Sequence, residues 1–301
     1  MPDVAPPHRI EDQWPTFVLG AGQMGAGIAQ VFICAGFRVG LSDVDPHRFA
    51  EARDRIEKSL ARRVQKGEMA AEAVTAALSL LVDQPLVEAV ADYRLVIEAA
   101  TEREETKHAI FREIGRHIRP GTILTTNTSS ISITRLATLT ADPGTFMGLH
   151  FMNPVPAMRL VELIRGFATS DETFQTMKAI VERIGKTAMT SEDYPAFIVN
   201  RILIPMINEA VYTLFEGVGT VASIDAGLTL GANHPMGPFQ LADLIGLDTC
   251  LAIMTVLHDG LADTKYRPCP LLVKYVEAGW LGRKTGRGFY DYRSDPPQPT
   301  R

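Results

Sequence analysis

Short apolar runs alternate with longer segments in which apolar residues recur every three or four positions along the first two thirds of the chain. The short runs predict buried strands, and the longer segments predict amphipathic helices. The predicted strands are residues 16–20, 38–43, 94–98, 122–125, 145–149, 159–164 and 187–190. The predicted helices between them are residues 24–35, 46–66, 104–117 and 172–184. This alternation predicts an α/β fold, in which helices cover both faces of a doubly wound, largely parallel sheet.

The pattern changes near residue 193. Strand-like runs disappear, and the rest of the chain is a series of apolar helical segments separated by glycine and proline. The first of these, beginning near Pro195, is apolar around most of its circumference, which is typical of a helix buried between domains or subunits. We therefore expect two domains, an α/β domain over residues 1–193 and an all-helical domain over residues 194–301. The apolar helices also favour a homodimer, although they could simply pack on the first domain.

The composition excludes several classes of protein. The chain has 301 residues, 46% of them hydrophobic and 22% charged, with a net charge of −5. This charge gives no general attraction to nucleic acid or to an anionic membrane. The apolar runs are too short to span a bilayer, and the N-terminal residues resemble no secretory signal. Three scattered cysteines predict neither disulfides nor a metal site, so we expect reduced thiols and a cytoplasmic location.

The sequence GAGQMG follows the first predicted strand and opens the first predicted helix. A GxGxxG string in this context, here Gly20, Gly22 and Gly25, predicts a Rossmann-type turn whose backbone N–H groups bind a pyrophosphate. Asp43 ends the next strand about 20 residues later, where a carboxylate accepts from ribose hydroxyls and repels a 2′-phosphate. We therefore expect NAD rather than NADP. Asp45 competes for this role, but it precedes Pro46 and is better interpreted as a helix cap.

Oxidation of an alcohol by NAD also requires a base, and histidine is the side chain best suited to neutral pH. Among seven histidines, His150 alone lies at the carboxyl end of a predicted strand, where open α/β sheets bind ligands. Glu162 is the one charge in the apolar run RLVELI, twelve residues later. A strand–loop–strand connection would bring the two together, with the carboxylate orienting the imidazole. The alternative is a core histidine and a surface glutamate.

These motifs and six others together resemble the 3-hydroxyacyl-CoA dehydrogenase family, and most closely its compact bacterial 3-hydroxybutyryl-CoA dehydrogenase type. The resemblance covers residues 17–292. Its segments, in order, are GAGQMGAGIAQ, VIEAATE, NTSSISIT, GLHFMNPVPAMRLVELI, AFIVNRIL, GANHPMGPFQLADLIGLD, YRPCPLL and GWLGRKTGRGFYDY. Because so many motifs occur in register, the resemblance implies NAD as cofactor, an acyl-CoA as substrate and a homodimer.

The resemblance also implies roles for single residues. His150 matches the family's general base and Glu162 its partner, while Ser129 and Asn200 match the groups that hold the substrate's 3-oxygen and the imidazole. From the sequence alone, Ser129 follows a strand, where it could donate to a developing oxyanion or serve as a turn residue.

Three further positions match family contacts to the nicotinamide half of the cofactor; they are Glu102, Lys107 and Asn153. Without the resemblance, Glu102 and Lys107 would be interpreted as the charged start of a helix.

The last implication concerns coenzyme A and a basic helix. Seven lysines or arginines lie between Arg48 and Lys66 against three acids, which suits phosphates but equally suits a solvated helix face with internal ion pairs. Ser59 and Lys66 match family positions that contact coenzyme A.

The departures from the family pattern are small, namely Met152 in HFMN and the small residues Ala99, Ala100 and Thr101 in the cofactor region. We therefore predict NAD-dependent oxidation of an L-3-hydroxyacyl-CoA, with a short acyl chain. Two alternatives stay open, a dehydrogenase of a free 3-hydroxy acid such as L-gulonate or carnitine, and an NAD-binding protein without turnover.

Overall fold

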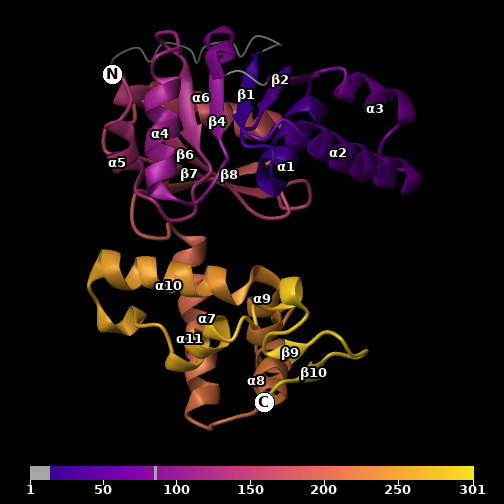
Figure 1. The fold of residues 1–301 in the computed structure, drawn as a ribbon, viewed down its shortest axis with the longest axis vertical. Coiled ribbons are helices and arrows are strands. Elements are labelled where there is room, and N and C mark those ends of the chain that lie inside the picture. The colour runs from indigo at the N-terminus through magenta and orange to yellow at the C-terminus, as the bar shows by residue number, and fades with distance from the viewer. Residues whose placement is uncertain (1–13, 85–86) are drawn as a thin grey trace, which may run out of the picture. The chain divides into compact units, whose positions relative to one another are not determined.

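The structure is a computed structural model that describes residues 14–84 and 87–301 (Figure 1). The N-terminal segment interpreted above, residues 1–13, lies outside the described residues. The chain divides into two compact units, the first ending at Asp193 and the second covering Tyr194–Arg301. Each unit is described by itself.

An eight-stranded sheet forms the centre of the first unit, with strand order β3-β2-β1-β4-β5-β6-β7-β8. The strands are β1 (Thr16–Leu19), β2 (Val39–Ser42), β3 (Leu81–Asp83), β4 (Leu95–Glu98), β5 (Ile123–Thr126), β6 (Phe146–Phe151), β7 (Leu160–Arg165) and β8 (Thr187–Glu192). The first six are parallel, and β7 pairs with β6 antiparallel and with β8 parallel. The strand order reverses between β1 and β4, which is where such sheets bind ligands.

Helices cover both faces of this sheet (Figure 1). The helices of the unit are α1 (Gln23–Cys34), α2 (Arg48–Gln65), α3 (Ala71–Leu78), α4 (Glu104–Ile114), α5 (Ile133–Ala137) and α6 (Asp171–Arg183), with short 3-10 turns η1 (Val87–Asp92) and η2 (Pro143–Thr145). Met147 belongs to the core that α1 and α6 share, whereas the ring of its neighbour Phe146 meets Phe111 of α4 at 5.2 Å. Because side chains alternate along a strand, His150 points to the same face as Phe146, the face of α4 and α5.

The second unit is helical. Its elements are α7 (Val199–Phe215), α8 (Val221–Ala226), η3 (Gly227–Gly231), α9 (Pro238–Ile245), α10 (Leu247–Leu261), η4 (Thr264–Tyr266), α11 (Pro270–Glu277), η5 (Arg283–Thr285) and a two-residue ladder between β9 (Tyr290–Asp291) and β10 (Gln298–Pro299). Two buried carboxylates organise its C-terminal segment: Asp243 accepts from the backbone N–H groups of Phe289 and Tyr290, and Asp225 accepts from the Tyr290 hydroxyl. They anchor a segment with little regular structure to the helices.

No single helix among the described residues has the length and apolar character to cross a membrane; the pair α9 and α10 passes that test only together, across a 95° bend.

The predicted fold class is confirmed, an α/β unit followed by a helical one. The sequence interpretation missed three elements of the first unit, strand β3 and helices α3 and α5, because they are short and because α3 is rich in alanine and lacks a wide apolar stripe. Strand β3 forms the edge of the sheet beyond β2, and α3 packs against α1 and α2.

Candidate active site

The glycine turn joins β1 directly to α1 at the point where the strand order reverses. Gly20 has φ +103°, and a Cβ there would lie 2.5 Å from the Ala99 carbonyl oxygen, so a side chain is excluded. A Cβ at Gly25 would lie 1.7 Å from the Gly20 carbonyl oxygen, which shows how closely α1 packs on the strand. By contrast, a Cβ at Gly22 would meet nothing within 4 Å. The backbone at Gly22 therefore faces open space, and a ligand can approach it closely.

The start of α1 fits a pyrophosphate. Gly22 is the N-cap residue, and no side chain caps the first turn. The N–H groups of that turn and the positive end of the helix dipole are therefore directed at the space in front of Gly22.

Asp43 follows β2 and supports the same turn. Its Oδ2 accepts from the backbone N–H of Ala21 at 2.7 Å, and its Oδ1 accepts from the backbone N–H of Asp45 at 3.1 Å. Each oxygen keeps a second lone pair for a ribose hydroxyl. Asp45 accepts from the N–H of His47 in the turn ahead of α2. The N-cap residue of α2 is His47, so Asp45 is a turn residue and not the predicted helix cap.

The loop after β6 returns to this turn. Asn153 Oδ1 accepts from Gln23 Nε2 at 3.0 Å, and Val155 packs against Gly27, where a Cβ would lie 2.9 Å from Val155 Cβ. Asn153 is thereby placed beside the first turn of α1. The residues around the turn fit a dinucleotide that runs from Asp43 past Gly22 toward this loop.

His150 and Glu162 are in direct contact. They are opposite each other in the antiparallel pair β6–β7, and His150 Nδ1 lies 2.6 Å from Glu162 Oε2. Glu162 is fully buried and His150 is 7% exposed. A carboxylate can only accept, so Nδ1 carries the proton in this pair and Nε2 presents a lone pair. The arrangement can take a proton from a neighbouring hydroxyl.

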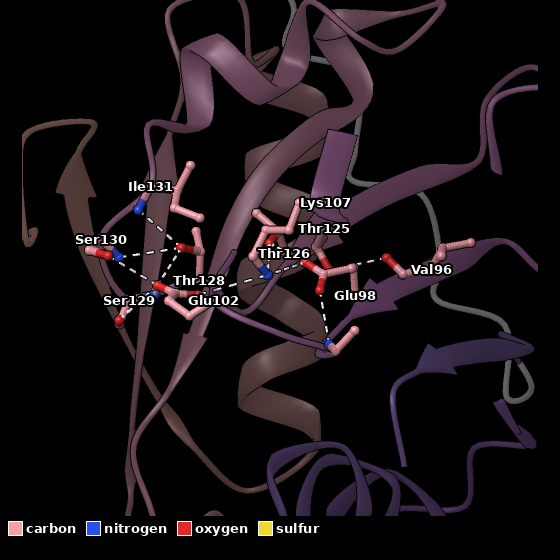
Figure 2. Close-up of polar contacts among 11 residues, drawn as sticks. Val96, Glu98, Glu102, Lys107, Thr125, Thr126, Thr128, Ser129, Ser130 and Ile131 are labelled. Atoms are coloured by element: carbon pink, nitrogen blue, oxygen red, sulfur yellow. Dashed lines mark hydrogen bonds and ion pairs between the residues drawn. The ribbon is translucent and has the colours of Figure 1, made fainter. Parts of the chain in front are cut away.

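Ser129 lies in the loop that follows β5, and Glu102 holds that loop (Figure 2). Glu102 Oε1 accepts from four groups within 3.1 Å; they are Thr128 Oγ1, Ser129 N, Ser129 Oγ and Ser130 Oγ. The Ser129 hydroxyl thus donates to Glu102 in this structure. It must rotate in order to donate to a substrate.

Lys107 is 2% exposed, although the charge pattern of α4 alone suggested a solvated residue. Its Nζ donates to Oε2 of the fully buried Glu98 at 2.6 Å and lies 3.9 Å from Glu102 Oε2 (Figure 2). The structure therefore places the Lys107 ammonium between the buried carboxylate of Glu98 and the carboxylate of Glu102. The predicted cofactor contact of Lys107 stays a prediction.

Two residues that the sequence interpretation missed form hydrogen bonds that connect parts of the site. Glu98 is the first, and its signal was available, since it is the one charge in the apolar strand LVIE. Asn127 is the second; its Oδ1 accepts from the backbone N–H of Phe151 at 2.8 Å, which joins the Ser129 loop to the strand end that carries His150. Nothing in the sequence distinguishes Asn127 from an ordinary turn residue.

Ser59 and Lys66 line a cavity of about 690 Å³ on the first unit. Its other charged lining residues are Arg62, Arg63, Glu68, Arg183 and Lys186. Burial, aided by the charge of Arg63, lowers the pKa of Lys186. An excess of cations in one hollow suits a polyanion, although α2 also forms the internal ion pair Asp54–Lys58 at 2.6 Å.

Asn200 is the second residue of α7, in the second unit. Its predicted role rests on the FIVNR motif and stays a prediction. The described residues contain no group of three or more His, Cys, Asp or Glu side chains that could hold a metal ion.

Known proteins resemble this chain in both sequence and fold. A family model for the NAD binding domain of 3-hydroxyacyl-CoA dehydrogenase matches residues 16–194, and one for the C-terminal domain matches residues 197–292. A 3-hydroxybutyryl-CoA dehydrogenase of Bradyrhizobium diazoefficiens is 61% identical over 284 residues, which cover 94% of this chain and 97% of that one. A probable 3-hydroxybutyryl-CoA dehydrogenase of Bacillus subtilis is 52% identical over 275 residues, which cover 91% of this chain and 96% of that one. The crystal structure of (S)-3-hydroxybutyryl-CoA dehydrogenase from Ralstonia eutropha matches with a TM-score of 0.91 and 44% identity, over 93% of this chain and 99% of that one.

Proposed function

Because the chain belongs to the 3-hydroxyacyl-CoA dehydrogenase family, we propose that it oxidises the 3-hydroxyl group of short-chain L-3-hydroxyacyl-CoA thioesters such as 3-hydroxybutyryl-CoA. It is an NAD-dependent oxidoreductase. The observation that carries the proposed chemistry is the buried contact of 2.6 Å between His150 and Glu162 at the carboxyl edge of the sheet.

NAD, when it is bound by Gly20, Gly22, Gly25 and Asp43, supplies the hydride acceptor for this reaction. His150 Nε2 takes the proton of the 3-hydroxyl group. Glu162 keeps the imidazole in the tautomer that can accept and stabilises the imidazolium that forms. In the reverse direction the imidazolium returns its proton to the 3-keto oxygen.

Ser129 donates to the 3-oxygen as negative charge develops there. Its hydroxyl turns from Glu102 Oε1, 2.8 Å away, to the substrate. Glu102 keeps the backbone N–H of Ser129, so the loop stays in place while the hydroxyl rotates. Asn200 is proposed as a second donor on the strength of its motif.

The cavity lined by Ser59 and Lys66 is proposed to hold the phosphates of coenzyme A. Its arginines and lysines supply charge-assisted hydrogen bonds of the kind that phosphates accept. A free 3-hydroxy acid has no phosphates to place in this cavity, so the excess of cations favours the thioester as substrate.

The second unit is proposed to form a homodimer. Three large apolar side chains of this unit are exposed, Val218 by 75%, Leu230 by 88% and Phe215 by 53%, and a partner would cover them. Light scattering should give a mass of twice 33.0 kDa, and a monomer at assay concentration would contradict the dimer.

The experiment that tests the function follows NADH absorbance after NAD is mixed with racemic 3-hydroxybutyryl-CoA, free 3-hydroxybutyrate or a longer acyl-CoA. We expect consumption of half the short thioester and little reaction of the acid. Turnover of the acid alone would assign the protein to the free-acid dehydrogenases. Bound NADH with no turnover of any substrate would make it a cofactor-binding protein.

A further inference from the structure

A fully buried carboxylate, Glu98, ends strand β4, two strands from β6 and on the sheet face that α4 covers. Its Oε1 accepts from the backbone N–H of Ala100 at 2.9 Å. Its Oε2 accepts from Lys107 Nζ and from Thr126 Oγ1, each at 2.6 Å (Figure 2). A buried charge is costly unless it is paired and hydrogen-bonded, so these groups are held in one arrangement.

Lys107 connects this buried carboxylate to a half-exposed one. Glu98 holds its ammonium from the buried side, and Glu102 Oε2 lies 3.9 Å away on the other side, with 42% of the Glu102 side chain exposed. The ammonium therefore attracts Oε2 of Glu102 and leaves Oε1 directed at the loop of residues 128–130. The charges run in the order minus, plus, minus from the sheet to the loop.

Glu102 in turn sets the position of Ser129. Both the backbone N–H of Ser129, at 2.7 Å, and its hydroxyl, at 2.8 Å, donate to Glu102 Oε1. A displaced Glu102 would break these hydrogen bonds and move the Ser129 hydroxyl.

We propose that Glu98 is a positioning residue for the reaction: it fixes Lys107, which fixes Glu102, which sets Ser129. The proposal rests on the proposed function, in which the Ser129 hydroxyl reaches the substrate oxygen. When the Glu98 charge is removed, the Lys107 ammonium turns to Glu102, and the loop of residues 128–130 loses its acceptor. Gly22 and Asp43 are untouched, so the defect appears mainly in turnover, and any loss of cofactor affinity is limited to the nicotinamide contact predicted for Glu102.

The kinetic test uses Glu98→Gln, Glu102→Gln and the double variant E98Q/E102Q. We expect E98Q to lower kcat about tenfold or more while the KM for NAD changes less than about threefold. The double variant should be no slower than E102Q alone, because Glu98 acts through Glu102. Two losses that multiply would overturn the proposal. Glu104→Gln is the matched control, since Glu104 begins the same helix but pairs with Arg135, and it should keep the wild-type kcat.

A second variant covers the case in which E98Q does not fold, since it leaves Lys107 buried without its carboxylate. E98Q/K107M removes both charges and should recover the wild-type Tm, but it also removes the ammonium that fixes Glu102, so kcat should stay low. A kcat that returns to the wild-type value together with Tm would show a purely structural ion pair and overturn the proposal.

Amide hydrogen exchange at Ser129 gives a measurement that does not depend on turnover. Because this N–H donates to Glu102, it should exchange faster in whichever of E98Q and E98Q/K107M folds than in the wild type and in E104Q. Unchanged exchange would overturn the proposal even if kcat fell. If the wild type oxidises no 3-hydroxyacyl-CoA, the proposed function fails, while faster exchange in the variants still supports the coupling from Glu98 to Ser129.

Discussion

Replacing Glu162 by Gln should lower kcat far more than it weakens NAD binding. The change removes a fully buried carboxylate whose oxygen lies 2.6 Å from His150 Nδ1. A hydrogen bond to a charged group contributes about 1.5–3 kcal/mol. Since each 1.36 kcal/mol is a factor of ten, loss of that hydrogen bond from the imidazolium alone lowers the rate about 10- to 150-fold.

The amide adds a second effect. A glutamine can donate its NH₂ to Nδ1, which moves the ring proton to Nε2, where it blocks acceptance of the substrate proton. In a serine-protease triad the comparable acid-to-amide change costs about 10⁴ in kcat. We therefore expect the loss in E162Q to lie between about 10-fold and 10⁴-fold.

The assay is steady-state NADH formation at saturating NAD, with NADH affinity measured separately by fluorescence titration. The chain offers a matched control in Glu113, near the end of α4, whose carboxylate lies 3.1 Å from His117 in the turn that follows the helix. Both variants change a glutamate of a His–Glu pair to glutamine, and Glu113→Gln should leave kcat unchanged. If E162Q also kept its kcat within about threefold, the pair would have no part in the mechanism.

Three further changes have defined outcomes. Asp43→Asn should raise the KM for NAD about tenfold, because an amide has one accepting oxygen where the carboxylate has two. It should also weaken the discrimination against NADP, because the neutral amide does not repel the 2′-phosphate. An unchanged ratio of kcat/KM for NAD to kcat/KM for NADP would contradict this. Lys66→Met should raise the KM for 3-hydroxybutyryl-CoA several-fold but not that for the pantetheine thioester, which lacks the nucleotide phosphates; equal effects on both would remove Lys66 from coenzyme A binding. Burial raises the pKa of Asp243 from its ordinary value of 3.8 to about 6, so the folded state holds this proton more tightly than the unfolded state does. The contribution of Asp243 to the free energy of unfolding should therefore fall as pH rises from about 4 to 7, by at most about 3 kcal/mol. Urea unfolding at both pH values measures this, and Asp243→Asn should remove that part of the slope; an equal slope in the variant would refute the assignment.

The sequence predicted the fold well where each element carries its own pattern. The glycine turn and the run FVL before it specify a strand and a helix, and the structure has β1 and α1 there. Helix α3 lacks such a pattern, because AEAVTAAL has a high helix propensity but few large apolar residues, and what holds it is contact with other elements. Propensity without amphipathic spacing is a weak signal for an element.

Prediction of the candidate site from sequence has a related limit, which is clear from Glu162 and Glu98, the lone acids in two apolar strands of the sheet. A carboxylate inside an apolar strand must have a partner, because a buried unpaired charge is costly. Glu162 and Glu98 therefore both predict a partner from sequence alone, but the partner depends on geometry. For Glu162 it follows from the antiparallel register, which sets His150 directly opposite. For Glu98 it depends on how α4 lies over β4, which brings in Lys107 from nine residues away. Local sequence thus indicates where a charged residue is buried in the sheet. Only the packing of helix on sheet determines whether its partner contacts the reacting atoms or, as with Lys107, positions the residues that do.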